Sequence, residues 1–355
     1  MNLQFNAAAI INDEVYFSAK NFNGLFKWDL NTNDVNLIGH FPKEKLWGEH
    51  LHQFAVYYDD IIYFIPYFGQ HITKYDIKTG EFSCLPIEEG DVYFGISHVL
   101  KYENRYVFVP RKLRNPVGIF YPESGVLEKI SFVNESELSI FYSDIFCATI
   151  VDGGVYIPVY DTALIIKCDL ANREISKISL GDMRVSSITY YNDKFWVISA
   201  SGKIIRRYSE NFDIEKEYCV FGGTERPYEC WVQYSKKLYL CGCLDESLIF
   251  YDTNSDSWKE IYRGERERVN NKWAFMCGYQ AYNDKLFIYP SSSNCMYVLN
   301  HGKIVNLYFE YNEFDLQEEI QRGKNKYYFD DCKDQIHYEG EYVVLNDLIN
   351  YMENF

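Results

Sequence analysis

The sequence of 355 residues contains no apolar run of about 18 residues, the length that a membrane-spanning helix requires. Its start, MNLQFNAAAIINDEVYF, lacks the basic segment that precedes the apolar part of a secretion signal. No stretch rich in Pro, Gly or Ser divides the chain into parts. We therefore expect one main domain, a cytoplasmic location and no membrane partner.

Lysine and arginine are scarce relative to the acidic residues. The chain has 35 Lys and Arg against 51 Asp and Glu, which gives a formal net charge of −16. Proteins that bind nucleic acid neutralise its phosphates with Lys and Arg, and a strongly acidic protein repels phosphate. We therefore expect no nucleic-acid partner, and anionic membranes are disfavoured for the same reason.

Cysteine pairs at metal-ligand spacing are nearly absent. Ten cysteines are present, but only Cys241 and Cys243 lie close together in the sequence. Most cysteines sit in apolar, strand-like segments, where a thiol behaves as a small buried hydrophobe, and without a secretion signal we expect them to stay reduced. Because a structural zinc site needs ligands beyond one such pair, the sequence predicts structural thiols and no metal or other cofactor.

Common catalytic motifs are missing as well. The chain has no nucleophile elbow, no glycine-rich phosphate loop, no HExxH helix and no dinucleotide fingerprint. Carboxylates are abundant, but no pair can be given an acid and a base role from the sequence. The sequence therefore assigns no catalytic residue and leaves open whether the protein is an enzyme.

What the chain does contain is one pattern that returns seven times. An apolar stretch, a short polar turn and a tyrosine-rich apolar stretch recur, with 40 to 49 residues between successive turns. This period is typical of four-stranded propeller blades, and the aromatic content of 18% suits β-strands. The seven turns are Asn12-Asp13, Asp59-Asp60, Glu103-Asn104, Asp152-Gly153, Asn192-Asp193, Ser235-Lys236 and Asn283-Asp284.

Each unit predicts four antiparallel strands. In the second unit we expect strands at 52–57, 61–66, 71–75 and 81–86. Between the last two, Asp76 offers its carboxylate to nearby amides and Gly80 permits a positive φ. Such units must stack face to face to bury their surfaces, and radial closure protects their edges. The sequence therefore predicts an all-β fold, a seven-bladed β-propeller over residues 1–309.

The turns between third and fourth strands carry a resemblance to a known group. WDLNTND (28–34), CDLANRE (168–174) and YDTNSDSW (251–258) have an aromatic residue or cysteine followed by Asp. The YD-x4-W form of 251–258 and the Tyr-Asp turns, such as that at 75–76, resemble kelch-type repeats, as in galactose-oxidase-like propellers, although the Gly-Gly doublet after the second strand is missing from nearly every unit. The resemblance spans residues 3–309 and implies the same propeller fold.

Residues 310–355 leave the repeat. Segments 326–329 and 335–340 are expected to pair as a hairpin, and the apolar spacing from Leu345 to Met352 favours a short helix. We expect this tail to pack on the propeller or to close the ring. The alternative is a helix that binds a partner.

The connections that emerge around the central channel are the places to look for function, since loops on rigid scaffolds carry it. Glu49, His50 and His52 are close in sequence, and in an extended strand the two histidines would point the same way, near His98 of the next blade. Such a group suits a metal ion, a ligand pocket or ordinary channel lining. Metal binding is the weaker interpretation, because no third ligand is certain.

Arginines from different blades are expected near the channel mouth, where guanidinium groups bind carboxylates or phosphates. They can equally pair with acidic residues to hold the loops, and we favour that interpretation. Aromatic side chains in the same loops suit sugar stacking or protein contacts. The further candidate ligand-binding residues are Arg111, Asp144, Arg184, Arg226, Glu229 and Trp273.

Two functions fit these patterns. The first is a binding module that presents its loops to a protein or glycan partner. The alternative is a carbohydrate-active enzyme, an epimerase, mutarotase or lyase, with histidines as acid or base and arginines holding an acidic sugar. The sequence names neither the ligand nor the oligomeric state.

Overall fold

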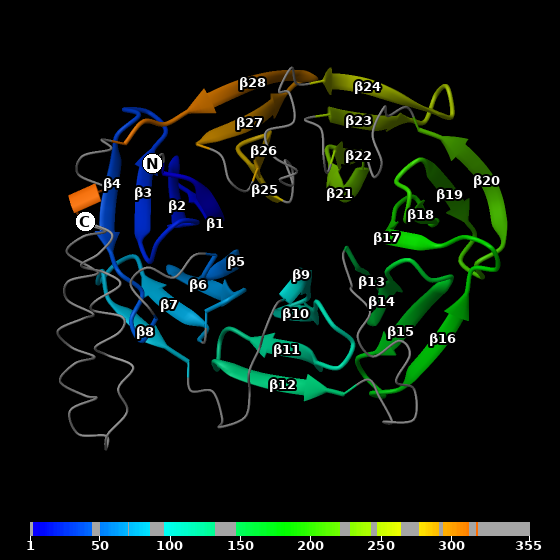
Figure 1. Ribbon diagram of the computed structural model, residues 1–355, viewed down its shortest axis with the longest axis horizontal. Helices are drawn as coiled ribbons and strands as arrows, with labels where there is room; N and C mark the ends of the chain where they lie inside the picture. Colours follow the sequence, from blue (N-terminus) through cyan, green and yellow to red (C-terminus); the bar gives the residue numbers. More distant parts are fainter. Residues whose placement is uncertain are drawn as a thin grey trace, which may run out of the picture.

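Seven four-stranded sheets arranged around a central axis make up the computed structural model (Figure 1). In each sheet the strands follow one another in sequence order and are antiparallel, and the predicted seven-bladed β-propeller is thereby confirmed. The structure describes residues 3–44, 50–69, 71–85, 96–131, 147–220, 228–242, 247–263, 277–290, 294–311 and 317–318. The hairpin and helix predicted for the tail lie outside these residues.

The first strand of each blade lies next to the axis and the fourth lies on the rim (Figure 1). Blades 1 to 3 consist of β1 (Phe5–Ile11), β2 (Glu14–Ala19), β3 (Leu25–Asp29), β4 (Val35–Gly39), β5 (His52–Tyr58), β6 (Ile61–Pro66), β7 (Thr73–Asp76), β8 (Phe82–Cys84), β9 (Ile96–Tyr102), β10 (Arg105–Pro110), β11 (Val117–Tyr121) and β12 (Val126–Ile130).

Blades 4 to 7 repeat the arrangement. They consist of β13 (Thr149–Val151), β14 (Gly154–Val159), β15 (Leu164–Asp169), β16 (Ile175–Ser179), β17 (Val185–Tyr190), β18 (Phe195–Ser199), β19 (Ile204–Tyr208), β20 (Ile214–Cys219), β21 (Tyr228–Tyr234), β22 (Lys237–Gly242), β23 (Ser247–Asp252), β24 (Ser257–Arg263), β25 (Cys277–Tyr282), β26 (Lys285–Pro290), β27 (Cys295–Asn300) and β28 (Lys303–Tyr308).

The polar pairs predicted as turns join the first and second strands. In six of the seven pairs both residues have a positive φ, as at Asn12 (52°) and Asp13 (62°). Two such residues are what the tight type I′ hairpin turn requires, and Asn, Asp and Gly adopt this conformation most readily. The chain therefore reverses direction within two residues, which keeps the paired strands in register.

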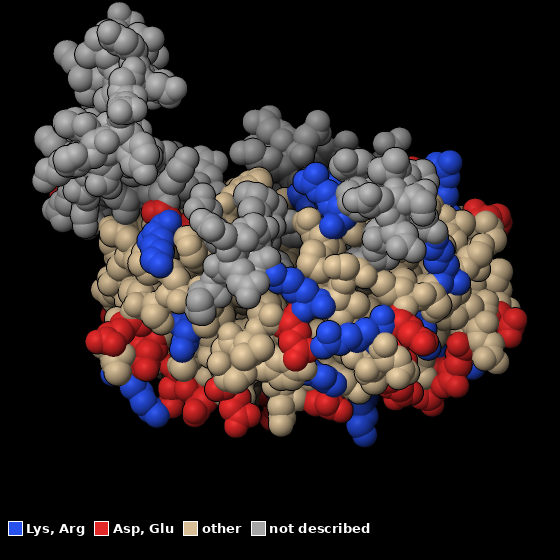
Figure 2. Space-filling model, turned by 90° about the horizontal axis from the view of Figure 1, so that it is seen from below, with Lys and Arg blue, Asp and Glu red and all other residues tan. Residues whose placement is uncertain are grey.

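The aspartates predicted in the turns between third and fourth strands have the expected role. The Oδ1 atom of Asp76 accepts hydrogen bonds from the amides of Lys78 (2.9 Å) and Thr79 (3.0 Å). Asp29 and Asp169 make the same pair of bonds in their blades. Asp and Glu side chains gather along the lower edge of the molecule in Figure 2.

The hydrophobic core is divided among the seven seams between blades. Seven apolar clusters are found in the described part of the chain, and each joins two neighbouring sheets. Between blades 3 and 4, for example, Val107 and Ile119 pack against Val155 and Ile157. Because each sheet is covered on both faces, its central strands are apolar without strict alternation.

Tyrosines at the ends of innermost strands join consecutive blades. Tyr191 donates to the carbonyl of Lys236 (2.6 Å), which lies in the hairpin turn of the next blade. Tyr234 donates in the same way to Asp284, and Tyr282 accepts from the amide of Asp13 (3.1 Å). The repeated tyrosine therefore packs its ring in the seam and satisfies a turn with its hydroxyl.

The ring closes through side chains. Among the described strands, none of blade 7 joins the sheet of blade 1. Instead, the Gln280 amide bonds both the amide and the carbonyl of Ile10 (2.7 Å each). Phe309, which follows β28, is buried against Phe5 (4.9 Å between ring centres) and Trp28 (5.3 Å). The segment that leaves the last blade thus packs into the first.

Candidate functional site

The predicted site residues that the structure describes belong to the end of the ring that carries two kinds of connection. One kind joins the second and third strands of a blade, and the other leads from a fourth strand to the next blade; we call this end the loop face. Glu49, Asp144, Arg226 and Trp273 lie outside the described residues, as does the side chain of Glu229. His50, His52, His98, Arg111 and Arg184 are described.

The structure does not bring His50 and His52 together. His50 precedes β5 with a φ of +50°, and its ring lies near Tyr67 (6.2 Å between ring centres) and Phe68 (6.3 Å). His52 begins the strand and is fully buried beside Phe41 (4.2 Å). The left-handed backbone at His50 turns the chain before the strand starts. His50 is therefore not part of the extended strand, and the two side chains do not point the same way as predicted.

His52 is part of the core. Neither of its ring nitrogens has a hydrogen-bond partner among the described residues, and burial lowers its pKa to about 3. A neutral imidazole is therefore the form present at neutral pH. In this position the ring has no access to a ligand at the surface.

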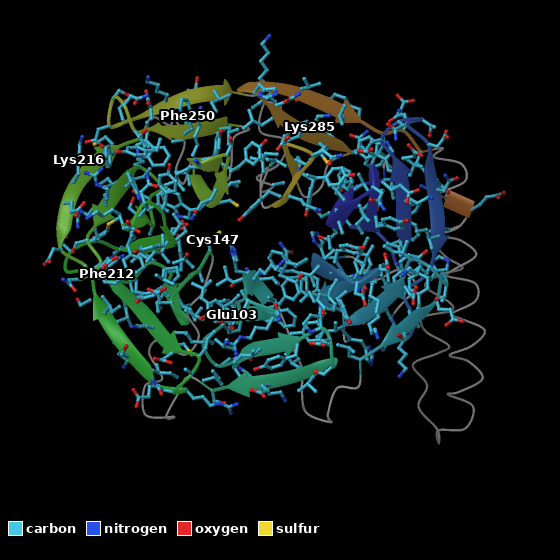
Figure 3. All side chains as sticks on the ribbon, turned by 180° about the vertical axis from the view of Figure 1, so that it is seen from behind. Glu103, Cys147, Phe212, Lys216, Phe250 and Lys285 are labelled. Atoms are coloured by element: carbon cyan, nitrogen blue, oxygen red, sulfur yellow. The ribbon has the colours of Figure 1, made fainter. Side chains whose placement is uncertain are left out.

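His98 is a half-buried residue of β9, near the centre of the ring. Its ring lies 6.3 Å from that of Phe54, and its side chain is hydrogen-bonded to the Cys147 thiol. Figure 3 shows Cys147 facing the central opening. A hydrogen bond with Cys230, together with burial, raises the pKa of Cys147 well above its usual value, so its thiol stays protonated.

Arg111 joins a group of aromatic side chains on the loop face. Its guanidinium lies over the ring of Tyr67 (5.7 Å) and donates to the Tyr67 hydroxyl. The ring of Tyr67 packs on that of Phe68 (4.5 Å), and the side chain of Phe68 is 59% exposed. We call His50, Tyr67, Phe68 and Arg111 the aromatic cluster. Its residues come from three loops. His50 lies in the connection that leads into blade 2, Tyr67 and Phe68 lie in the loop after β6 of blade 2, and Arg111 lies in the loop after β10 of blade 3.

A buried carboxylate supports the same loop. The side chain of Glu44 is only 3% exposed; its Oε1 accepts from the His71 amide (3.0 Å) and lies 3.4 Å from His71 Nδ1. Gly69 lies between Phe68 and His71 in the sequence. A Cβ atom at this position would lie 2.8 Å from the carbonyl of Leu51, so glycine is required there. Carboxylate and glycine together fix the course of this connection.

Tyr67, Phe68, Glu44 and His71 were not among the predicted site residues. The sequence holds one signal for them: two adjacent aromatic residues and a glycine in a connection between strands. His71 was predicted to belong to a strand, but β7 begins only at Thr73.

Arg184 lies between blades 4 and 5. Its Nη1 is 3.3 Å and 3.4 Å from the two carboxylate oxygens of Asp161, which is therefore an acidic partner of Arg184. The pair borders a cavity of about 360 Å³. The residues that line it are Asp161, Asp182, Met183, Arg184, Ser199, Ala200, Ser201, Ile204 and Arg206.

Arg111 and Arg184 thus belong to two separate places on the loop face, the aromatic cluster and the cavity. Among the described residues, no group of three His, Cys, Asp or Glu side chains is arranged to hold a metal ion. No helix in the described part of the chain is long and apolar enough to cross a membrane.

Comparison with known proteins places the chain by its fold. No family model and no curated protein matches the sequence. Solved structures do match: virginiamycin B lyase from Staphylococcus aureus, crystallised in a catalytically inactive form with quinupristin, has a TM-score of 0.59 at 12% identity, over 82% of this chain and 92% of the lyase. The likeness shows the fold alone.

Two further structures are similar over 87% of this chain. YCF48 bound to D1 peptide has a TM-score of 0.60 at 7% identity and is covered over 93% of its length. BamB from Moraxella catarrhalis has a TM-score of 0.52 at 13% identity and is covered over 85%. The seven-bladed propeller is therefore shown, whereas the resemblance to kelch-type repeats receives no support from a family match.

Proposed function

We propose that this protein is a binding module that holds a protein partner on its loop face, at the aromatic cluster. The observation that carries the proposal is Phe68, whose side chain is the most exposed large hydrophobic one in the described part of the chain. It is flanked by Tyr67 and Arg111. Aromatic residues and arginine are enriched at protein interfaces and among their hot spots.

The backbone beneath the cluster is fixed before any partner arrives. The amide of Phe68 donates to the carbonyl of His50 (3.1 Å), and the amide of Tyr67 donates to that of Leu51 (2.8 Å). Because an ordered loop loses little conformational freedom on binding, more of the contact energy appears as affinity. The cluster is thus a preorganised anchor for an apolar side chain of the partner.

The comparison with YCF48 supports this proposal, since that propeller is described with a bound peptide. Kinship with kelch-like propellers, a cytoplasmic location and a glycan as partner belong to the same proposal. The Tyr-Asp turn at 251–252 favours the first, the position of most cysteines in apolar strand-like segments favours the second, and the exposed aromatic rings favour the third.

The test is affinity capture with the purified protein as bait, comparing wild type with Phe68→Ala. We expect the specific partner to be lost from the variant. Ile214→Ala is the matched control, because Ile214 is similarly exposed but lies on the rim strand β20. If Phe68→Ala and Tyr67→Ala both retain every captured protein at the wild-type level, the cluster is not the binding surface.

One observation favours the alternative, a carbohydrate-active enzyme. The Glu44 carboxylate lies at Nδ1 of His71, an arrangement that orients an imidazole and leaves Nε2 to exchange a proton. Arg111 lies on the same face, in a position to hold an acidic sugar. NMR of acidic and neutral sugars incubated with the protein tests this. Turnover that His71→Ala abolishes and Phe68→Ala retains would support the enzyme over the binding module.

A further inference from the structure

The cavity between blades 4 and 5 has the size and lining of a small-molecule site. Its volume of about 360 Å³ falls within the usual range for such sites. Met183, Ala200 and Ile204 supply apolar surface, and Met183 is buried. The hydroxyls of Ser199 and Ser201, 2.9 Å apart, lie beside this surface. Two carboxylates and two guanidinium groups complete the lining.

One pair of charges at the cavity joins a mostly buried arginine to an exposed carboxylate, since the side chain of Asp182 is 81% exposed. Arg206 donates from Nη1 to Asp182 (2.7 Å) and from Nε to Glu217 (2.7 Å), and its side chain is only 13% exposed. Arg206 also lowers the pKa of Asp182. Held between two carboxylates, Arg206 is fully compensated, and Asp182 keeps a negative charge at the cavity.

The other pair is loose. Arg184 and Asp161 approach only to 3.3 Å, and their side chains are 70% and 50% exposed. Exposed pairs with such geometry contribute little to stability. Both groups can therefore turn from each other to a ligand, so the cavity offers one available cation beside two carboxylates.

From this arrangement we propose that the cavity binds a free α-amino acid. The α-carboxylate pairs with Arg184, the α-ammonium group lies between Asp161 and Asp182, and an apolar side chain packs on Met183 and Ile204. A ligand with one charge would leave either Arg184 or Asp161 without a partner once the two separate. A zwitterion pairs with both Arg184 and Asp161. A free amino acid carries the required carboxylate and ammonium group on one small molecule. The site is independent of the aromatic cluster.

Isothermal titration with three probes that share the leucine side chain tests the proposal. L-leucine carries both charges, L-leucinamide only the ammonium group and N-acetyl-L-leucine only the carboxylate. We expect leucine to bind, and we expect each derivative to bind at least about tenfold more weakly than leucine. This is the usual effect of losing a charged hydrogen bond. Equal binding of leucinamide or of N-acetyl-leucine would overturn the proposal. So would the absence of binding by all twenty amino acids.

Variants locate the binding. Arg184→Ala and Asp161→Asn should each weaken leucine binding about tenfold, and Arg173→Ala should leave it unchanged. Arg173 is a matched control, because it forms an exposed pair with Glu128 at the opposite end of blade 4. All three changes lie on the surface, and thermal unfolding verifies that each variant is folded. Leucine binding that survives Arg184→Ala would contradict the proposal, whereas Phe68→Ala should not affect it.

Discussion

At the scale of single residues, His52 shows how a polar side chain is accommodated in an apolar seam. Its ring lies among the rings of Phe41 and Phe64, and no described residue bonds its nitrogens. An unsatisfied buried polar group costs about 1–3 kcal/mol. The neutral imidazole is tolerated because the ring still fills the space between two sheets. Protonation of the ring should destabilise the folded protein.

The change that tests this is His52→Leu, measured by urea unfolding at pH 7 and pH 5. The folded-state pKa of about 3 lies below the usual value of about 6.5. The unfolded chain therefore binds a proton in this interval that the folded chain does not, and stability falls as the pH falls from about 6.5 towards 3. At pH 5 the wild type should lose about 2 kcal/mol through this residue, and the variant should not.

At pH 7 the same variant should be at least as stable as the wild type, since it removes an unsatisfied group. His40→Leu is the control: His40 Nδ1 donates to the carbonyl of Asn23 (2.5 Å), so its loss should destabilise the protein. An equal loss of stability between pH 7 and pH 5 in wild type and His52→Leu would show that His52 is not the titrating group.

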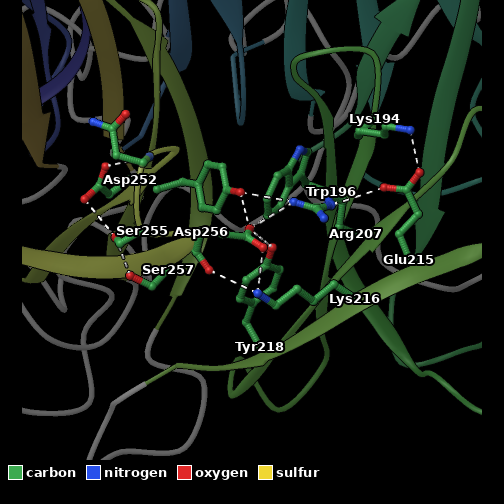
Figure 4. Close-up of polar contacts among 12 residues, drawn as sticks. Lys194, Trp196, Arg207, Glu215, Lys216, Tyr218, Asp252, Ser255, Asp256 and Ser257 are labelled. Atoms are coloured by element: carbon green, nitrogen blue, oxygen red, sulfur yellow. Dashed lines mark hydrogen bonds and ion pairs between the residues drawn. The ribbon is translucent and has the colours of Figure 1, made fainter.

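At the scale of elements, the turn between β23 and β24 binds blade 6 to blade 5 through hydrogen bonds and ion pairs. Asp256, between β23 and β24, accepts from Lys216 Nζ (2.7 Å), the Tyr218 hydroxyl (2.6 Å) and Arg207 Nη1 (3.1 Å), as Figure 4 shows. The hydrogen bond from Lys216, followed by those from the Tyr218 and Tyr251 hydroxyls, holds the pKa of Asp256 well below its usual range. Three donors from β19 and β20 thus converge on one residue, and the turn depends on its charge.

Asp256→Asn removes that charge and keeps the shape of the side chain. We expect a loss of about 1 kcal/mol, because the site is partly exposed to solvent, together with faster hydrogen exchange in β20 and β24. Since the folded pKa is lowered, this contribution is present above the unfolded pKa of about 3.9 and is lost at lower pH.

Asp193→Asn is the matched control for this change. Asp193 also has a left-handed backbone (φ 57°), in a hairpin turn. If both variants lose the same stability and exchange in β20 stays as slow as in wild type, the network does not join the two blades.

At the scale of the whole molecule, the period of the turns was sufficient to predict the fold. Pairs such as Asn12-Asp13 determine local backbone geometry by themselves, so their spacing reports the blades directly. Less of the candidate site could be predicted from the sequence. The conformation of His50 and the contact of Arg111 with Tyr67 both depend on packing between segments distant in sequence, which no local pattern reports.

Closure of the ring is likewise a property of the whole molecule, and Phe309 tests it. Its ring is buried among Phe5, Phe17 and Trp28 of blade 1, although it follows the last strand of blade 7. Phe309→Ala should therefore reduce stability by about 3–5 kcal/mol in urea unfolding, the usual loss for a buried phenylalanine. Hydrogen exchange should accelerate first in β1 and β28, because blades 7 and 1 are the only neighbouring blades that do not follow each other directly along the chain.

Phe68→Ala is the control for size and residue type, and it should change stability by less than about 0.5 kcal/mol because Phe68 is exposed. If Phe309→Ala weakens all seven seams to the same extent in hydrogen exchange, the blades unfold as one unit and the closing contact is not the weakest point. If β1 and β28 are exposed first, the ring opens between its first and last blades, which do not follow each other directly along the chain.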